Sequence, residues 1–178
     1  MGVVTKRGDR GMTALLTGAP VRKDDRRIEA LGALDELVAF LGLAKALIRE
    51  DRVRETIAAI QDDLSSACAE VAACAKGGAA DPGRRIGRRH VARLEEEIGV
   101  LERKTAFRRC GFCVPGENMT AAALDVARVV GRRTERRLVA LRMKGACAYP
   151  GLIAYLNRLS DLLYLMARWH GTRGGKKR

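Results

Sequence analysis

The sequence predicts an all-α protein, a five-helix up-down bundle, and three observations lead to this fold class. Apolar residues make up 47% of the 178-residue chain and aromatic residues only 4%. Apolar residues recur at helical spacing in five stretches, and segments containing Gly or Pro separate most of these stretches. This pattern is typical of long helices packed in an antiparallel bundle, and the length suits one domain.

The five helices are expected in the following order. Asp24 or Asp25 would cap the first helix, which runs to about residue 50. The others are expected over about 52–75, 84–104, 118–143 and 152–169. The fourth would be roughly 35–40 Å long, enough to span a bundle. The residues expected to face the core are Ile28, Leu31, Leu34, Val38, Leu41 and Ile48, then Val53, Ile57, Ile60, Leu64, Cys68 and Val71, then Val91, Leu94, Ile98 and Leu101, and finally Leu152, Leu156, Leu159, Leu163 and Met166.

The chain divides into three regions. Residues 1–24 contain several glycines and show little periodicity, so we expect a loop. Residues 25–170 form the bundle, and residues 171–178 are expected to be a disordered basic tail. No run of eighteen apolar residues predicts a membrane helix, and the N-terminus lacks the apolar core of a signal peptide. Five cysteines, an odd number, favour reduced thiols in the cytoplasm.

The net charge of +13 raises the possibility of nucleic-acid binding, because Lys and Arg neutralise phosphates. However, the basic residues are spread over the whole chain, and many lie beside acids on the expected helices. No helix-turn-helix, zinc-finger or RNP-like string is present. A small ligand bearing phosphate is therefore favoured over nucleic acid.

The segment 5–13 is the first candidate site for such a ligand. Gly8 and Gly11 allow tight turns that point backbone N–H groups at phosphate oxygens, and Lys6 adds positive charge. The spacing of a Walker A loop is absent. Taken alone, the segment is better explained as a flexible basic N-terminus, and only the motifs that follow make a ligand site the favoured interpretation.

The fourth helix carries the sharpest pattern. Arg128, Arg132 and Glu135 fall at i, i+4 and i+7, so they share one face. Guanidinium groups match phosphate and carboxylate geometry, although a run of charges on a helix is commonly a solvated face. Asp35 on the first helix is a candidate partner for an arginine across a subunit boundary. On the fifth helix, Asn157 lies one turn before Asp161.

One further motif is interpreted as a coincidence. Cys110 and Cys113 form a lone CxxC, with neither a second ligand pair nor a helix N-terminus to make it a zinc or redox site.

Six stretches, in order, resemble the PduO-type ATP:cob(I)alamin adenosyltransferases, and together they cover about residues 3–170. They are Thr5–Thr13, Lys23–Asp25, Glu29–Leu37, Phe112–Gly116, Ala127–Arg137 and Tyr155–Asp161. The strings R-R-x-E-R and Y-L-N-R-L-S-D are the most specific. One departure is that the family commonly has P-G-G where this chain has Pro115-Gly116-Glu117.

The resemblance implies a homotrimer that transfers the 5′-deoxyadenosyl group of ATP to cob(I)alamin, with ATP bound between subunits and accompanied by Mg²⁺. It also implies a reductase that supplies electrons to cobalt. By position, the residues similar to the family's ATP site are Thr5, Lys6, Gly8, Lys23, Arg132, Glu135 and Asn157. Asp35 and Arg128 resemble an intersubunit salt bridge beside the corrinoid, and Phe112 resembles the aromatic residue that closes the lower face of the corrin ring.

Two alternatives to the enzyme stay open at this point. One is a non-catalytic corrinoid or nucleotide carrier of the same fold, which the charge of Glu117 and the short tail would favour. The other is a basic helical module that binds nucleic acid, which the high isoelectric point would favour.

Overall fold

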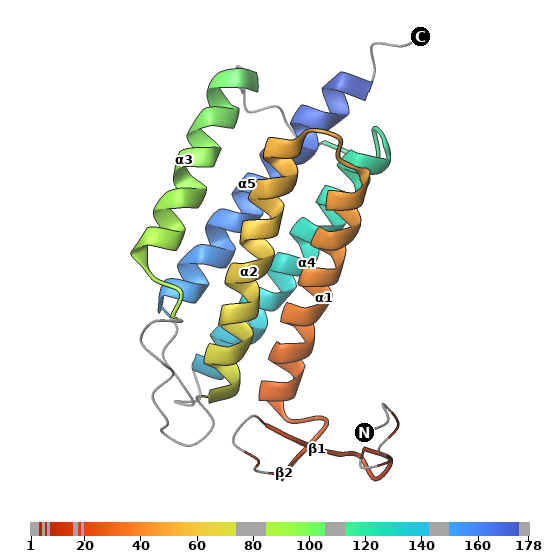
Figure 1. The fold of residues 1–178 in the computed structure, drawn as a ribbon, viewed down its shortest axis with the longest axis vertical. Helices are drawn as coiled ribbons and strands as arrows, with labels where there is room; N and C mark the ends of the chain where they lie inside the picture. The colour runs from red at the N-terminus through yellow and green to blue at the C-terminus, as the bar shows by residue number, and fades with distance from the viewer. Residues whose placement is uncertain are drawn as a thin grey trace.

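The computed structural model describes residues 4, 6, 8–15, 18, 20–73, 85–105, 113–142 and 150–174. Its helices are α1 (Arg26–Leu47), α2 (Asp51–Ala73), α3 (Arg88–Thr105), α4 (Met119–Arg142) and α5 (Pro150–Gly174). Each helix runs antiparallel to the one before it (Figure 1). The prediction of a five-helix up-down bundle is confirmed for the described part of the chain.

Residues 1–24 were predicted to be a loop, and part of this prediction is wrong. Strands β1 (Met12–Ala14) and β2 (Pro20–Arg22) pair in an antiparallel hairpin, with Thr13 opposite Val21. The hairpin lies at the end of the bundle where α1 begins (Figure 1). Strands of three residues are too short for the alternation of side chains to be visible in the sequence.

The helix ends decide one predicted boundary and correct another. Of the two predicted candidates, Asp25 caps α1: its side chain accepts a hydrogen bond from the Arg27 backbone N–H at 2.9 Å. That side chain also pairs with the Arg27 guanidinium, and these interactions lower the pKa of Asp25 to about 2. At the other end, α5 continues past Trp169 to Gly174, so residues 171–174 are helical and do not belong to a disordered tail.

The core of the bundle follows the predicted stripes. Leu34 and Leu41 of α1, Ile57, Ile60, Leu64 and Val71 of α2, Leu94 and Leu101 of α3 and all five residues predicted for α5 are buried. The other predicted core residues, apart from the buried Ile48, lie half-buried at the flanks: Ile28, Leu31, Val38, Val53, Cys68, Val91 and Ile98. The α4 helix packs between α1 and α5, and α3 packs on α5.

Buried polar groups hold α3 against α2 and α5. The Asp63 carboxylate on α2, almost fully buried, accepts a hydrogen bond from the Tyr155 hydroxyl at 2.8 Å and pairs with Arg93 of α3. Burial and the neighbouring Asp63 raise the pKa of Tyr155 above its ordinary range. About two turns after Asp63 on α2, Glu70 accepts a hydrogen bond from the Ile86 backbone N–H at 3.2 Å. These contacts join the start of α3 to α2 and α5, and residues further along α3 line the site described below.

The start of α5 approaches the segment before α3 closely at Gly151. A Cβ atom on Gly151 would lie 2.2 Å from the Ile86 carbonyl oxygen, a backbone atom that cannot move away cheaply. We therefore expect Gly151→Ala to destabilise the protein by at least about 2 kcal/mol, because backbone in a packed core must shift to accept the methyl group. Chemical denaturation or the melting temperature measures this loss.

The matched control is Gly99→Ala on α3. Its Cβ atom would meet only the end of the flexible Arg103 side chain, at 3.4 Å. Alanine is the better helix former, so this variant should gain roughly 0.5–1 kcal/mol. Equal changes in the two variants would contradict the close approach at Gly151.

Candidate functional site

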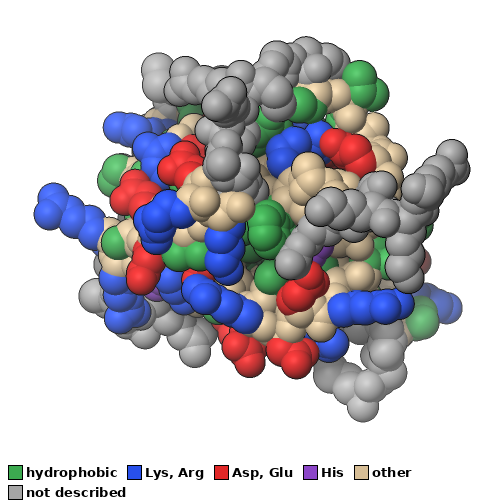
Figure 2. All heavy atoms as spheres, turned by 90° about the horizontal axis from the view of Figure 1, so that it is seen from above, with side chains coloured by type: hydrophobic (Ala, Val, Ile, Leu, Met, Phe, Trp, Pro, Cys, Tyr) green, Lys and Arg blue, Asp and Glu red, His purple; other side chains and the backbone are tan. Residues whose placement is uncertain are grey.

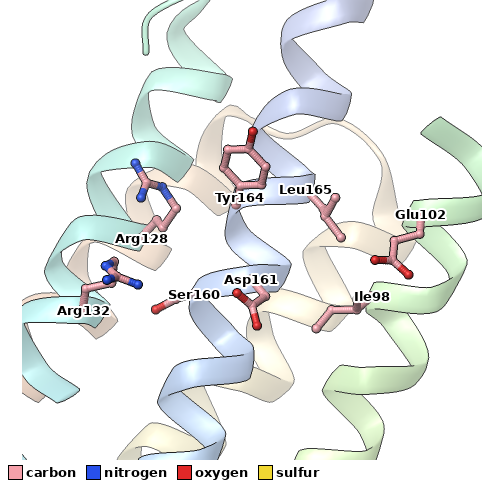
Figure 3. Close-up of a pocket in the computed structure, with 8 residues that line it drawn as sticks. All are labelled: Ile98, Glu102, Arg128, Arg132, Ser160, Asp161, Tyr164 and Leu165. Carbon is pink, nitrogen blue, oxygen red and sulfur yellow. The ribbon is translucent and has the colours of Figure 1, made fainter. Parts of the chain in front are cut away.

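A pocket of about 390 Å³ opens between α3, α4 and α5 (Figure 3). Its lining combines basic, acidic and apolar side chains: Ile98, Glu102, Arg128, Arg132, Ser160, Asp161, Tyr164 and Leu165. Arg128 and Arg132 lie one helical turn apart on α4, and both face this pocket, as the spacing predicted. Two adjacent guanidinium groups beside apolar side chains form a site suited to an anionic ligand with an apolar part.

The arginines of α4 divide between two faces of the helix. Arg133 pairs with Glu36 and Arg137 pairs with Glu29, so one face binds α1. Arg132 and Arg136 are exposed, and among the described residues neither has a carboxylate within ion-pair distance. The arginine face beside the pocket is therefore available to a ligand, whereas the face toward α1 is structural.

Arg128 is half-buried and has a partner that the sequence analysis did not identify. Its Nε donates to Asp125 Oδ1 at 3.0 Å, and the Asp125 side chain is only 4% exposed. Arg168 of α5 pairs with the other oxygen of Asp125. The i, i+3 spacing of Asp125 and Arg128 was a signal in the sequence, but the contribution of Arg168 depends on how α4 and α5 pack.

Asp35 does not meet Arg128 within one chain. Asp35 is exposed on α1. The pKa of Cys68 on α2 is raised first by the burial of the Cys68 thiol and then by the negative charge of Asp35. Arg128 faces the opposite group of helices, α3 and α5. The expected pair of Asp35 and Arg128 therefore requires a second copy of the chain.

The N-terminal candidates form a separate group. A Cβ atom on Gly8 would lie 2.9 Å from Lys23 Nζ, so the hairpin brings these two predicted residues together. Lys23 N–H donates to Gly11 O at 2.9 Å, and Lys6 has a φ of 55°, in the left-handed region. The hairpin residues Ala14 and Leu15 line an apolar hollow with α1 and α2, away from α3 and α5.

On α5, Arg158 forms hydrogen bonds with two polar residues of the same helix. Its Nη1 donates to Asn157 Oδ1 at 2.6 Å and to Asp161 Oδ2 at 3.2 Å. Asp161 lines the pocket, whereas Asn157 and Glu135, both half-buried, are not part of its lining.

The structure thus brings Arg128 and Arg132 into one pocket, places Gly8 and Lys23 together elsewhere, and leaves Asp35 on the side of α1 and α2. Thr5, Phe112 and Cys110 lie outside the described residues. Sequence reasoning did not identify Glu102, Tyr164, Asp125 or Arg168; only the helix spacing of Asp125 offered a signal.

Other features bear on the kind of ligand. No group of three or more His, Cys, Asp or Glu gathers as a metal site among the residues that the structure describes. None of its described helices is long and apolar enough to cross a membrane. Figure 2 shows Lys and Arg side chains interspersed with Asp and Glu on one end of the bundle, which does not resemble the continuous basic patch of a nucleic-acid surface.

Comparisons with known proteins agree on one family. The profile of the family described as Cobalamin adenosyltransferase matches residues 3–170. A corrinoid adenosyltransferase from Citrobacter freundii is 38% identical over 170 residues, which cover 93% of this chain and 93% of that protein. The corrinoid adenosyltransferase PduO from Salmonella typhimurium is 37% identical over 94% of this chain, but the chain spans only 49% of its length. A solved variant of the PduO-type ATP:corrinoid adenosyltransferase from Lactobacillus reuteri, complexed with cobalamin and ATP, has a TM-score of 0.83 and 29% identity, covering 96% of this chain and 94% of that one.

Proposed function

The chain belongs to the cobalamin adenosyltransferase family, and on this premise we propose how its residues carry out the family's reaction. The protein transfers the 5′-deoxyadenosyl group of ATP to cob(I)alamin, forming adenosylcobalamin and triphosphate. The observation that carries our assignment of the site is the pair Arg128 and Arg132, which face one pocket from successive turns of α4. We assign triphosphate binding to Arg132 and corrinoid binding to Arg128.

The reaction makes limited demands on the protein. Cobalt(I) is itself the nucleophile: its electron pair forms the bond to the ribose C5′, and the bond from C5′ to the triphosphate oxygen breaks. No side chain has to remove a proton. The protein has to align cobalt with C5′, neutralise the charge of the leaving triphosphate and exclude water.

For the nucleotide, the proposed ligands come from two groups of residues. Arg132, Glu135 and Asn157 lie on α4 and α5, and the N-terminal group comprises Thr5, Lys6, Gly8 and Lys23. Exposed Arg132 has no carboxylate partner among the described residues, so its guanidinium is available to phosphate oxygens. Because Gly8 has no side chain, Lys23 Nζ lies close to the Gly8 backbone, and we propose that this ammonium group binds the phosphates.

The described residues also fit Mg²⁺ as a companion of the nucleotide. Glu135, half-buried on α4 one turn after Arg132, is the candidate carboxylate, and the phosphates would supply most of the other ligands. Proteins commonly hold Mg²⁺ in this way, through one or two carboxylates and the substrate phosphates. The ion would neutralise charge on the triphosphate.

For the corrinoid, the pocket supplies Arg128 together with the apolar faces of Ile98, Leu165 and Tyr164. Phe112 precedes Cys113, whose Sγ lies 3.9 Å from the Tyr164 hydroxyl, at the same pocket. We propose that Phe112 covers the lower face of the corrin ring and displaces the axial ligand. The resulting four-coordinate cobalt(II) is easier to reduce to cobalt(I), with electrons from a partner reductase.

We further propose a homotrimer with the site shared between copies. The hairpin and Asp35 are on the side of α1 and α2, whereas Arg128 and Arg132 face α3 and α5. Both groups can serve one substrate only if different copies supply them. Exposed apolar side chains on α1 and α4, namely Leu43, Val126 and Val129, support an interface there. The proposed location is the cytoplasm, where the thiol of Cys68, which is not in a disulfide, would stay reduced.

Arg132→Ala and Lys6→Ala should each raise the KM for ATP by about tenfold or more while changing the KM for the corrinoid little, because each removes a charge-assisted hydrogen bond to phosphate. Steady-state kinetics with cob(I)alamin and ATP measures both constants. Arg133→Ala is the matched control: it removes a neighbouring arginine that pairs with Glu36, and it should leave both KM values unchanged. Equal effects on both substrates would contradict the assignment of Arg132.

The shared site predicts complementation between two variants that bind ATP weakly. In a trimer assembled from equal amounts of Lys6→Ala and Arg132→Ala chains, about a quarter of the sites combine an intact N-terminal segment with an intact α4. At ATP concentrations well below the wild-type KM, mixed assemblies should therefore recover about a quarter of the wild-type activity or slightly more, whereas each variant alone keeps about a tenth or less. Sedimentation should show a trimer. A monomer, or mixed assemblies without recovery, would rule out the shared site.

Phe112→Ala should separate reduction from transfer. With ATP bound, wild-type protein should give the electron paramagnetic resonance signal of four-coordinate cob(II)alamin, and the variant should not. The variant should lose activity from cob(II)alamin but keep more of it from pre-reduced cob(I)alamin. If Phe112 is only a core residue, its loss costs about 3–5 kcal/mol and both activities fall with the melting temperature.

A further inference from the structure

Four charged side chains form a continuous chain from the pocket to the segment before α4. Arg128 Nε donates to Asp125 Oδ1 at 3.0 Å, and Arg168 pairs with Asp125 Oδ2. The other terminal nitrogen of Arg168, Nη1, donates to Glu117 Oε1 at 2.7 Å. We refer to Arg128, Asp125, Arg168 and Glu117 as the ion-pair chain. It links α4, α5 and segment 113–118.

The centre of the ion-pair chain is buried. The side chains of Asp125 and Arg168 are 4% and 10% exposed, and Arg168 also lies over the Tyr164 ring, 5.5 Å from its centroid. Buried charges are tolerated when they are paired, and here two guanidinium groups and two carboxylates balance. Removing one member would leave a buried charge without its partner.

Arg168 limits how Asp125 can hold Arg128. Since Arg168 takes Oδ2, Asp125 contacts Arg128 through a single nitrogen, Nε, and does not form the two-pronged pair that carboxylates often make with arginine. The two Nη groups of Arg128 therefore have no other ion-pair partner among the described residues and remain for the pocket that Arg128 lines.

The same chain ties segment 113–118 to the end of α5. Besides the pair of Glu117 and Arg168, Asn118 Nδ2 donates to the His170 carbonyl at 2.8 Å, while Asn118 Oδ1 caps α4 at Ala121 N. A Cβ atom on Gly171 would lie 3.1 Å from Glu117 Cδ, so the missing side chain leaves room for this carboxylate. The α4 helix begins and α5 ends at the same end of the bundle (Figure 1).

We propose that Asp125 and Arg168 are positioning residues for the adenosyl transfer: Asp125 holds Arg128 through Nε and leaves its Nη groups for the corrinoid side of the pocket, where they would also meet Asp35 of a second copy, and Arg168 connects the Asp125 carboxylate to Glu117. The inference rests on the proposed role of Arg128 at the corrinoid. Glu117 consequently does not place an unpaired charge beside the corrinoid, because Arg168 binds it. The segment that follows Phe112 in the sequence is held relative to Arg128 by the same contacts.

The test compares Asp125→Asn with Asp63→Asn. Both replace a nearly buried, arginine-paired aspartate within the bundle, but Asp63 pairs with Arg93 and Tyr155 instead of the pocket arginine. We expect both to lower the melting temperature. Asp125→Asn alone should also raise the KM for cob(I)alamin by about tenfold, leaving the KM for ATP nearly unchanged, because Arg128 loses a charge-assisted hydrogen bond. Arg168→Gln should shift the same constant in the same direction.

A double-mutant cycle with Arg128→Ala tests whether Asp125 changes the KM for cob(I)alamin through Arg128. If Asp125 acts through Arg128, adding Asp125→Asn to Arg128→Ala should cause little further rise in the KM for cob(I)alamin. Effects that multiply, or an Asp125→Asn variant that behaves like Asp63→Asn, would overturn the positioning role while leaving the role of Arg128 intact. If Arg128→Ala itself leaves that KM unchanged, the proposed corrinoid role of Arg128 fails, and the positioning role fails with it.

Discussion

Helix α4 carries six arginines and yet packs between α1 and α5, and the rest of the structure depends on how these arginines are paired. A guanidinium left without a partner in a helix interface would be costly. Carboxylates pair with three of the arginines: Glu36 and Glu29 on α1 with Arg133 and Arg137, and Asp125 on α4 itself with Arg128. Arg132 and Arg136 are exposed and have no carboxylate partner among the described residues.

The same requirement operates on the other side of the bundle. Asp63, nearly buried on α2, pairs with Arg93 and accepts a hydrogen bond from Tyr155, so one carboxylate joins α2, α3 and α5. The pair involves Arg93, near the start of α3, whereas the pocket residues of this helix, Ile98 and Glu102, lie further along it. Two buried carboxylates, Asp63 and Asp125, thus have distinct tasks: one places a helix, and the other orients an arginine.

The division of the site residues between two sides of the bundle follows from the topology. The hairpin joins the start of α1, and α1 and α2 form one side, while α3 and α5 flank the pocket. One chain therefore presents an arginine pocket and, elsewhere, a turn of Gly8 and Lys23 suited to phosphate. Adenosyl transfer needs charge neutralisation on the triphosphate and a dry, apolar surround for cobalt. In the proposed homotrimer, neighbouring copies would bring the two together.

The sequence by itself determined the number and order of the helices, their core stripes and the shared face of Arg128 and Arg132. These features depend on local periodicity: side chains three or four positions apart lie on one side of a helix whatever surrounds it. The hairpin was not predicted, because strands of three residues are too short to show an alternation of side chains. The extension of α5 to Gly174 was not predicted, because a glycine ordinarily signals the end of a helix. Only the tertiary structure decided which charges meet. Arg168 lies 43 positions from Asp125 and Glu36 lies 97 from Arg133, and no local rule relates such residues, because their approach depends on how whole helices pack.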